Sequence, residues 1–268
     1  MKDDLALRDT FDSVASLYNE IRPRYPDELF STLIKVTGLL PSHKILEIGL
    51  GTGQATKPLA MLGYDILGIE LGTALTSIAV RELNPYPNVH IINSAFEDIS
   101  LPHNSFDMVM AATSFHWIKP EARFAKPYEL LKNDKYLAII HTHHISDDRG
   151  DVFFKTSLPI FNRFNFIDVP LPSLPPAESI KPATVDRTRF KPVHFQCFRS
   201  VLNYTADDFC KLLNTYSNHL AASRDQLEDF LTEIRTFINQ EFNGRIEKHF
   251  LMSLTVAQKI KQTVEQNK

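Results

Sequence analysis

Cysteine is scarce in this sequence, which contains only Cys197 and Cys210 in 268 residues. Two such residues give no disulfide framework, and this indicates a reducing compartment. The first nine residues, MKDDLALRD, carry too much charge for a secretory signal peptide. No apolar run approaches the roughly 20 residues that a membrane-spanning helix needs. We therefore expect a cytoplasmic protein without a membrane partner.

Clustered positive charge is also missing. The formal net charge is −3, and no block of Lys or Arg stands out. Nucleic acids and anionic membranes are usually bound by such a block, so we expect neither as a partner. Hydrophobic residues make up 43% of the chain, which is ample for a folded core. The length fits one large α/β domain or two small ones.

The stretch Lys44–Gln54, KILEIGLGTGQ, carries the strongest local pattern. Its apolar first part predicts a buried parallel strand, and its three alternating glycines predict a turn into a helix. Glycine permits positive φ and lets the backbone approach a ligand closely. The helix that follows presents free N–H groups and the positive end of its dipole. We expect this helix to begin near Thr52–Ala55, with Pro58 in its first turn.

Two acids flank this glycine turn. Glu47 precedes it, and Glu70 ends the next predicted strand, Asp65–Glu70, 17 residues after Gly53. An acid at the position of Glu70 suits ribose hydroxyls at a strand end. A dinucleotide fingerprint has glycine where this sequence has Gln54, and its ligand is a pyrophosphate. Glu47 would repel a pyrophosphate, but it would attract a ligand that carries positive charge.

Four motifs follow one another along the chain: EIGLGTGQ at 47–54, GIEL at 68–71, SAFED at 94–98 and FDMVMAATSFHW at 106–117. In this order they resemble class I S-adenosylmethionine (SAM)-dependent methyltransferases, in the small-molecule branch that includes type 11 and trans-aconitate methyltransferase-like enzymes. The resemblance covers about residues 10–145. It implies an α/β fold: a Rossmann-like, doubly wound seven-stranded sheet, mostly parallel with an antiparallel last strand, plus a helical lid. It also implies SAM as cofactor, S-adenosylhomocysteine as product and no metal.

The resemblance further implies which residues bind the cofactor: Tyr18, Arg22, Glu47, Gly49, Gly51, Thr52, Gly53, Gln54, Glu70, Leu71, Ala95, Phe96, Glu97 and Ala112. Tyr18 and Arg22 belong to a pattern, FDxxAxxYxxxRPxYP, that in relatives covers the cofactor near its methionine carboxylate. Their alternative roles are a core tyrosine and a solvated arginine. Glu97 matches the acid that accepts the adenine amino group, with Asp98 as the near alternative. Either acid could instead be a turn residue or a helix cap.

The block Ala112–Trp117 follows the predicted strand Phe106–Ala111, at the sheet edge where open α/β folds bind ligands. It should therefore face the transferable methyl group. His116 is a candidate general base or substrate hydrogen-bond donor, or else a structural histidine. Trp117, the only tryptophan, should pack under the cofactor. The block lacks the N/D-P-P-Y/F and Pro-Cys motifs of nucleobase methylation, which weighs against that chemistry.

Three histidines lie at the end of the predicted fifth strand, Tyr136–His141. His141 and His143 should share one face of the extended chain, and His144 should lie on the other. Zinc takes three or four protein ligands, and no nearby Cys or Glu-x-x-His completes a set, so we disfavour a metal site. A polar wall beside the substrate and a structural role both stay open. His143 is a second catalytic candidate.

We expect a single SAM-methyltransferase domain over residues 1–268. Its parts are an N-terminal helical cap (1–36), a cofactor-binding core (37–144), a Pro-rich insertion that helps to roof the active site (145–193), and closing strands with an inserted helical lid (194–268). Pro170 is the first of five prolines in the Pro-rich run, which ends at Pro182. Strands are expected over Phe195–Leu202 and Ile246–Ala257, and Thr73 and Thr205 are expected helix N-caps. The aromatic stripes near the C-terminus predict core packing more than a substrate pocket.

The function that we predict is SAM-dependent methyl transfer to a small molecule, and we favour O-methylation of a small acid or secondary metabolite. The alternatives are a non-catalytic SAM-binding regulatory protein and a methyltransferase that acts on a macromolecule. A dehydrogenase is disfavoured because Gln54 and Glu47 break the dinucleotide pattern.

Overall fold

The computed structural model describes residues 4–147, 149–166 and 172–261. Seven strands form one sheet in the order β3-β2-β1-β4-β5-β7-β6. Their bounds are β1 Lys44–Ile48, β2 Asp65–Glu70, β3 Val89–Asn93, β4 Phe106–Ala112, β5 Leu131–His144, β6 Phe190–Thr205 and β7 Arg245–Lys259. The first five strands pair in parallel, whereas β7 is antiparallel to both β5 and β6. The predicted Rossmann-like sheet with an antiparallel last strand is confirmed.

The helices cover both faces of this sheet. The longer ones are α2 Asp27–Thr37, α4 Thr73–Leu83, α7 Val152–Phe164, α8 Ala206–Leu213 and α10 Arg224–Glu241. The shorter ones are η1 Asp4–Val14, α1 Ala15–Ile21, α3 Thr56–Met61, η2 Phe115–Trp117, α5 Pro120–Arg123, α6 Ala125–Leu130, η3 Ala177–Ser179 and α9 Ser217–Leu220. Within the described ranges, no helix combines the length and the apolar character that crossing a membrane requires.

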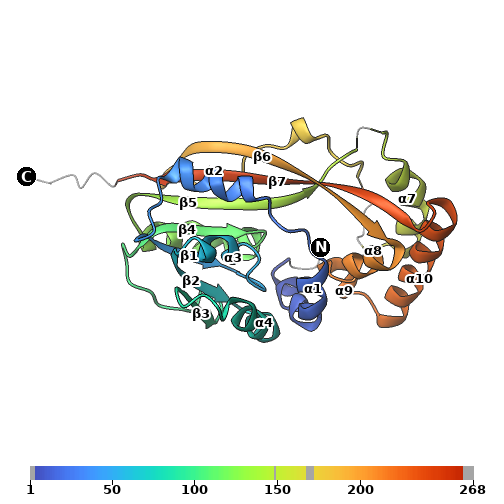
Figure 1. Cartoon of the computed structure of the whole chain (residues 1–268), viewed down its shortest axis with the longest axis horizontal. Coiled ribbons are helices and arrows are strands. Elements are labelled where there is room, and N and C mark those ends of the chain that lie inside the picture. The colour runs from blue at the N-terminus through green and yellow to red at the C-terminus, as the bar shows by residue number, and fades with distance from the viewer. Residues whose placement is uncertain (1–3, 148, 167–171, 262–268) are drawn as a thin grey trace, which may run out of the picture.

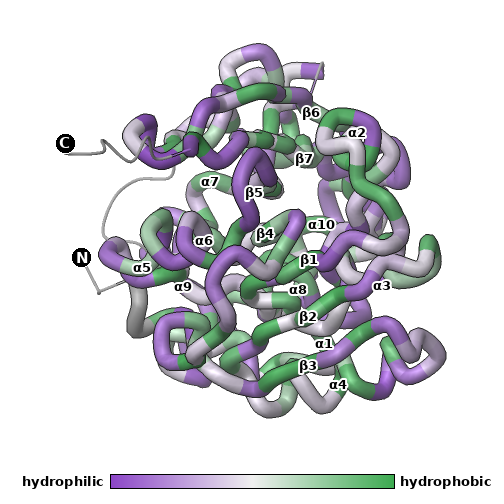
Figure 2. The backbone as a smooth tube through the Cα atoms, turned by 90° about the vertical axis from the view of Figure 1, so that its left-hand side faces the viewer, coloured by the Kyte–Doolittle hydropathy of each residue, from purple (hydrophilic) through white to green (hydrophobic). Residues whose placement is uncertain are grey.

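The central strands are apolar on both faces, as their sequences predict. Ile45 packs with helices on one side of the sheet and Leu46 with those on the other, because successive side chains of a strand point in opposite directions. Both residues are fully buried. Figure 2 shows the same hydrophobic stretches running through the strands in the middle of the molecule. Burial on both faces fixes the register of the sheet and so fixes which loops meet at its edge.

The glycine turn takes more residues than the sequence suggested. Residues 51–55 are turn, and α3 begins only at Thr56. Pro58 is the third residue of α3, as predicted, where its missing N–H and its ring do not disturb the helix.

The N-terminal segment, which comprises η1 and α1, is fastened to the core by a helix cap. The carboxylate oxygen Oδ1 of Asp12 accepts hydrogen bonds from the backbone N–H groups of Ala74 (2.6 Å) and Leu75 (3.0 Å) at the start of α4. The prediction that Thr73 is the N-cap is wrong, because Gly72 takes that position and Asp12 supplies the missing acceptor. A residue far away in the sequence therefore caps α4, and this ties the segment to the sheet edge.

The C-terminal strands are longer than predicted. Antiparallel pairing of β6 with β7 runs from Phe190 opposite Lys259 to Thr205 opposite Arg245, with one shift of register between Pro192 and His194. These strands extend beyond the parallel part of the sheet and end among α7, α8 and α10 (Figure 1). Thr205 is the N-cap of α8, as predicted, with its hydroxyl accepting from the Asp208 N–H at 3.1 Å. Of the Pro-rich run, Pro170 lies outside the described residues.

Candidate active site

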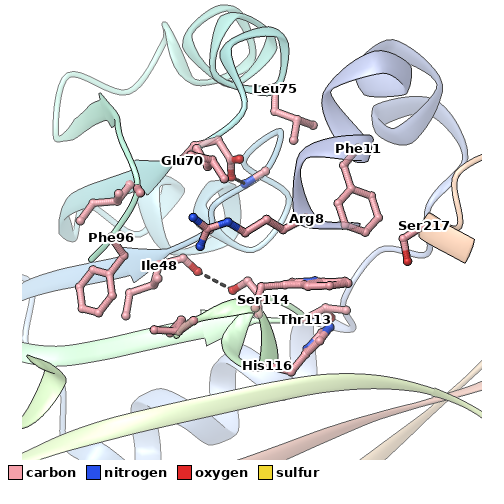
Figure 3. Close-up of a pocket in the computed structure, with 18 of the residues that line it drawn as sticks. Arg8, Phe11, Ile48, Glu70, Leu75, Phe96, Thr113, Ser114, His116 and Ser217 are labelled. Atoms are coloured by element: carbon pink, nitrogen blue, oxygen red, sulfur yellow. Dashed lines mark hydrogen bonds between the residues drawn. The ribbon is translucent and has the colours of Figure 1, made fainter. Parts of the chain in front are cut away.

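A cavity of about 290 Å³ lies at the carboxyl ends of β1, β2 and β4 and is called the first cavity below. The N-terminal segment and α9 close its outer side (Figure 3). Its volume is near the lower end of the range of small-molecule sites, roughly 300–1,000 Å³. The predicted site residues that line it are Tyr18, Arg22, Gly49, Gly51, Glu70, Leu71, Ala95, Phe96, Glu97, Ala112 and His116.

The remaining predicted residues divide into two groups. Glu47, Thr52 and Gln54 line a small recess of about 20 Å³ under the glycine turn, next to the first cavity. Gly53 and His143 line neither space. The structure therefore brings together most of the predicted site, and it leaves out one glycine and one of the two catalytic candidates.

The three glycines of the turn are there for two different structural reasons. All have positive φ, but a Cβ at Gly49 would lie 2.6 Å from the Cβ of Ser114, and one at Gly53 would lie 2.7 Å from Leu83 Cδ1. A Cβ at Gly51 would meet only a ring atom of Tyr18, at 3.9 Å. Gly49 and Gly53 thus allow close packing of the protein itself, whereas Gly51 leaves space in the cavity for a ligand.

Glu70 binds the glycine turn from the end of β2. Its Oε2 accepts from the Gly51 N–H at 2.7 Å, and its Oε1 accepts from the Gly72 N–H at 2.9 Å. Burial raises the pKa of Glu70, and these backbone hydrogen bonds partly oppose the rise. Each carboxylate oxygen has a second lone pair, so Glu70 retains capacity to accept from a ligand.

Glu47 lies beneath the turn with 1% of its surface exposed. The Thr56 hydroxyl donates to its Oε2 at 2.7 Å. Burial raises the pKa of Glu47 to about 7, the hydrogen bond from Thr56 lowers it, and the charge of Glu70 adds to the rise. A positively charged ligand in this region would stabilise both carboxylates in their ionised form.

Glu97 is engaged by the protein at the far side of the first cavity. Its Oε1 accepts from the Lys119 N–H at 2.8 Å and from Arg8 Nη1 at 3.1 Å. Burial acts to raise the pKa of Glu97, but these hydrogen bonds and the Arg8 charge outweigh it and hold the pKa below its usual value. Figure 3 shows Arg8 lying across the cavity. Glu97 is therefore ionised at neutral pH.

Arg22 links the N-terminal segment to the loop after α8. Its Nε donates to the Thr215 hydroxyl at 2.8 Å, and its Nη2 donates to the Thr215 carbonyl. The guanidinium carbon lies 5.0 Å from the centre of the Tyr18 ring and 4.6 Å from that of Tyr216. Arg22 thus lines the cavity, but much of its hydrogen-bonding capacity is used to join two parts of the chain.

Hydroxyl groups fix the end of β4 against its neighbours. Tyr25 Oη lies 2.9 Å from Thr113 Oγ1, which lies 3.2 Å from Thr142 Oγ1 on β5. Ser114 donates to the carbonyl of Ile48 at the end of β1 (Figure 3). Thr113 has a φ of 59°, a strained value for a β-branched residue. These bonds hold the cavity floor in one conformation.

A comparison with known protein families matches the part of the chain that contains the glycine turn. The family model described as a methyltransferase domain matches residues 46–139, which include the glycine turn, Glu70, Glu97 and β4. Residues 46–139 carry a methyltransferase domain of the class I SAM-dependent type. SAM is the cofactor of this type of domain, and the first cavity lies beside the matched residues, at the edge of the sheet.

Curated relatives support this assignment. A probable SAM-dependent methyltransferase of Saccharomyces cerevisiae is 34% identical over 126 residues, which cover 44% of this chain and 41% of the relative. An uncharacterized methyltransferase of Mycobacterium tuberculosis is 25% identical over 131 residues, covering 49% and 51%. The chain spans about half the length of the curated relatives that it matches.

Solved structures share the fold. A protein of Anaeromyxobacter dehalogenans that has been assigned as a type II methyltransferase superposes with a TM-score of 0.59 at 20% identity, covering 88% of this chain and 97% of that one. Phosphoethanolamine N-methyltransferase 2 of Haemonchus contortus, in complex with phosphomonomethylethanolamine and S-adenosylhomocysteine, has a TM-score of 0.51 at 15% identity, covering 93% and 58%. At these identities the likeness concerns the fold.

The residues around the glycine turn fit a SAM molecule on their own chemistry. Gly51 leaves open space beside its backbone, and the carboxyl groups of Glu70 and Glu47 lie on either side of the turn. SAM carries positive charge on sulfur, and its ribose hydroxyls are hydrogen-bond donors. Glu70 would hold the ribose, and Glu47 would favour the cation through the recess beneath the turn.

The predicted histidines do not form one cluster in the first cavity. His116 lines it, and its ring centre lies 6.2 Å from that of His141. His143 lies outside, with Nε2 2.8 Å from Ser253 Oγ on β7. His144 lies on the opposite face of β5, as predicted, with Nε2 3.1 Å from Tyr216 Oη. His143 therefore lies outside the first cavity, next to the neighbouring strand, and its catalytic role stays a prediction.

Metal ligands do not gather in the part of the chain that the structure describes: no three His, Cys, Asp or Glu side chains there could hold an ion. Burial lowers the pKa of His141 to about 4, and the nearby His116 and His143 lower it further. His141 is therefore neutral at physiological pH.

Sequence reasoning missed several residues of the first cavity, namely Arg8, Phe11, Leu75, Tyr216, Ser217 and Asn218. Phe11 was visible only as the first residue of the pattern around Tyr18, and Tyr216 only within the C-terminal aromatic stripes, where spacing does not distinguish a core aromatic from a cavity wall. Arg8 has no motif around it, and its partner Glu97 is 89 residues away. No local signal could have indicated this pair.

Proposed function

We propose that this protein transfers the methyl group of SAM to a small molecule, with O-methylation favoured. When bound, SAM supplies an electrophilic methyl group: a lone pair of the acceptor forms a bond to the methyl carbon while the carbon–sulfur bond breaks, and its electron pair remains on sulfur in S-adenosylhomocysteine. The observation that carries the proposal is the first cavity, in which the glycine turn and Glu70 meet at the carboxyl ends of the parallel strands.

The chain's own residues would contribute mainly by positioning. Glu70 and the Gly51 backbone orient the cofactor, and Phe11 and Trp117, whose ring centres lie 5.7 Å apart, exclude water. Holding two reactants in line is worth about 7–11 kcal/mol in favourable cases. A carboxylate acceptor needs no base, whereas a hydroxyl acceptor could give its proton to His116.

A small acceptor is supported by the closure of the first cavity. Arg22 joins the N-terminal segment to Thr215, so the residues before and after the central sheet meet over the opening. In this proposal residues 1–36 act as a cap and the helices within 194–268 act as a lid. A macromolecular acceptor would need these two parts to separate.

Calorimetric titration tests the cofactor assignment first. Purified protein should bind S-adenosylhomocysteine in the micromolar range and should not bind NADH. Glu70→Gln should weaken this binding by about 1–3 kcal/mol, because a buried acceptor of ribose hydroxyls loses its charge. Glu82→Gln on the surface of α4 is the matched control and should leave the affinity unchanged.

A transfer assay with methyl-labelled SAM then separates the candidate functions. We expect label to enter small carboxylic acids or hydroxyl compounds and not RNA or protein. Label in a macromolecule would replace the small-molecule proposal, and tight S-adenosylhomocysteine binding without turnover of any acceptor would favour a regulatory SAM-binding protein.

A further inference from the structure

A second cavity, of about 390 Å³, lies behind the first, among α7, α8 and the end of β7. Most of its wall is aromatic or aliphatic and includes Phe153, Phe154, Phe161, Phe209 and Leu213. The two cavities share two lining residues, Tyr216 and Asn218. An apolar space to which the sequence motifs contribute no residue therefore adjoins the first cavity.

The wall between the cavities is the ring of Tyr216. Its face stacks against the Arg22 guanidinium on the side of the first cavity. Its hydroxyl lies 3.1 Å from His144 Nε2, and His144 lines the second cavity. A molecule bound in the second cavity would thus contact the Tyr216 ring, which also lines the first cavity.

Lys248 puts a positive charge into this apolar space. Lys248 lies on β7, is 8% exposed and lines the second cavity. Among the residues that the structure describes, no carboxylate pairs with its ammonium group and no acceptor bonds it. A buried charge of this kind is costly unless something compensates it.

The neighbours of Lys248 compensate this charge only in part. Burial lowers the pKa of Lys248 to about 8, and the more distant charges of Asp151 and Asp147 raise it only in part. Burial also lowers the pKa of His144 to about 3, so His144 is neutral and adds no charge to the cavity. Lys248 is then mostly protonated at neutral pH and lacks an anion.

We propose that the second cavity binds the methyl acceptor, and that the acceptor is an amphipathic carboxylic acid whose apolar body lies among the phenylalanines and whose carboxylate pairs with Lys248. The inference rests on the proposed function and adds the class of substrate. Lys248 acts here as an anchor, and the ligand extends past Tyr216 and Asn218 toward the cofactor.

Direct binding of decanoate, with decanol as its neutral counterpart, tests the proposal without turnover. Decanoate should bind wild-type protein at least about ten times more tightly than decanol, because only its carboxylate can pair with Lys248. A tenfold difference in affinity corresponds to about 1.4 kcal/mol. Lys248→Met should abolish this difference by weakening decanoate alone. Lys155→Met is the matched control, since it removes one positive charge from the exposed face of α7, and it should leave both affinities unchanged.

Two outcomes would overturn the proposal. Equal binding of decanoate and decanol to wild-type protein would show that no anion is recognised. Unchanged decanoate affinity in Lys248→Met would show that Lys248 is not its partner. S-adenosylhomocysteine is titrated into the same preparations: if it binds and decanoate does not, only the acceptor proposal fails, and if it does not bind, the proposed function itself fails.

Discussion

The two cavities of this protein are built in opposite ways. The first is lined by backbone and carboxylates at the ends of parallel strands, and its main residues come from motifs within 47–117. The second is lined by aromatic side chains from α7 and α8 and by one lysine from β7. Two of these residues, Phe153 and Lys248, are nearly 100 positions apart in the sequence. The first suits a ligand common to a whole family, and the second suits a ligand particular to one member.

The charges of the cavities also differ in sign. Glu47 and Glu70 are buried beside the first, whereas Lys248 is buried beside the second. A cation and an anion would therefore be accepted on opposite sides of Tyr216. Electrostatic separation of this kind would reduce binding of either ligand at the wrong place.

The largest expected effect is on ligand affinity at the glycine turn, which belongs to the first cavity and not to the second. Gly51→Val should weaken S-adenosylhomocysteine by more than about 100-fold, because the added side chain enters the space in front of the backbone. Gly63→Val is the control: Gly63 also has positive φ and open space, so it carries the same backbone strain of about 1–2 kcal/mol away from the cavity. Gly49→Val would be a poor test because its Cβ would collide with Ser114.

Decanoate binding provides the counterpart measurement for Gly51→Val. It should stay within about twofold of wild type in calorimetry, because the second cavity does not include the glycine turn. Loss of both ligands in Gly51→Val but not in Gly63→Val would mean that the two cavities form a single site.

The next effect concerns Glu47 and pH. Its pKa in the folded protein is raised from 4.5 to about 7, so the folded state is favoured below pH 4.5 and loses that advantage as pH rises through 7. The corresponding loss is up to about 3 kcal/mol of unfolding free energy. Glu47→Gln should flatten this part of the profile in urea unfolding without ligand. An equally steep decline in the variant would assign it to other groups.

Lys248 should give a slope of the opposite sign. Because its pKa in the folded protein is lowered to about 8, the folded state is favoured at high pH and loses stability as pH falls through 8. His144 on β5 is neutral, and Asp147 and Asp151 partly offset the loss. Lys248→Met should therefore raise the melting temperature at pH 7 and leave it nearly unchanged at pH 10. A lower melting temperature at pH 7 would indicate a structural role for the ammonium group.

The smallest expected effect tests how the first cavity is closed. Asp12→Ala removes the acceptor for two N–H groups of α4 and should cost about 1 kcal/mol of unfolding free energy. Asp12→Asn keeps an acceptor oxygen and should cost less. Urea unfolding measures both. Equal losses in the two variants would mean that the charge matters and the hydrogen bonds do not.

The parallel half of the fold could be predicted from the sequence because its signals are local. The bounds predicted for β2 agree with the structure, and β4 ends only one residue later than predicted, since turn residues bracket short apolar runs. The class of cofactor was implied by the resemblance of four short motifs within residues 47–117 to SAM-dependent methyltransferases. Each motif is local and needs no knowledge of packing.

The other half could not be predicted in the same detail. β6 extends over Phe190–Thr205 because β7 pairs with it along that whole length, and pairing between distant segments leaves no local mark. The capping of α4 by Asp12 and the burial of Lys248 are likewise set by tertiary contacts. The aromatic stripes near the C-terminus were predicted as core, and the structure shows that Phe209 is buried yet also lines a cavity.

The shared wall of Tyr216 has a thermodynamic consequence. If an occupant of the second cavity moves this ring or fixes it, the change alters the affinity of the first cavity, and linkage requires the same factor in the reverse direction. A library of acids could then be ranked by its effect on S-adenosylhomocysteine affinity alone. The unknown acceptor would become detectable before any product is identified.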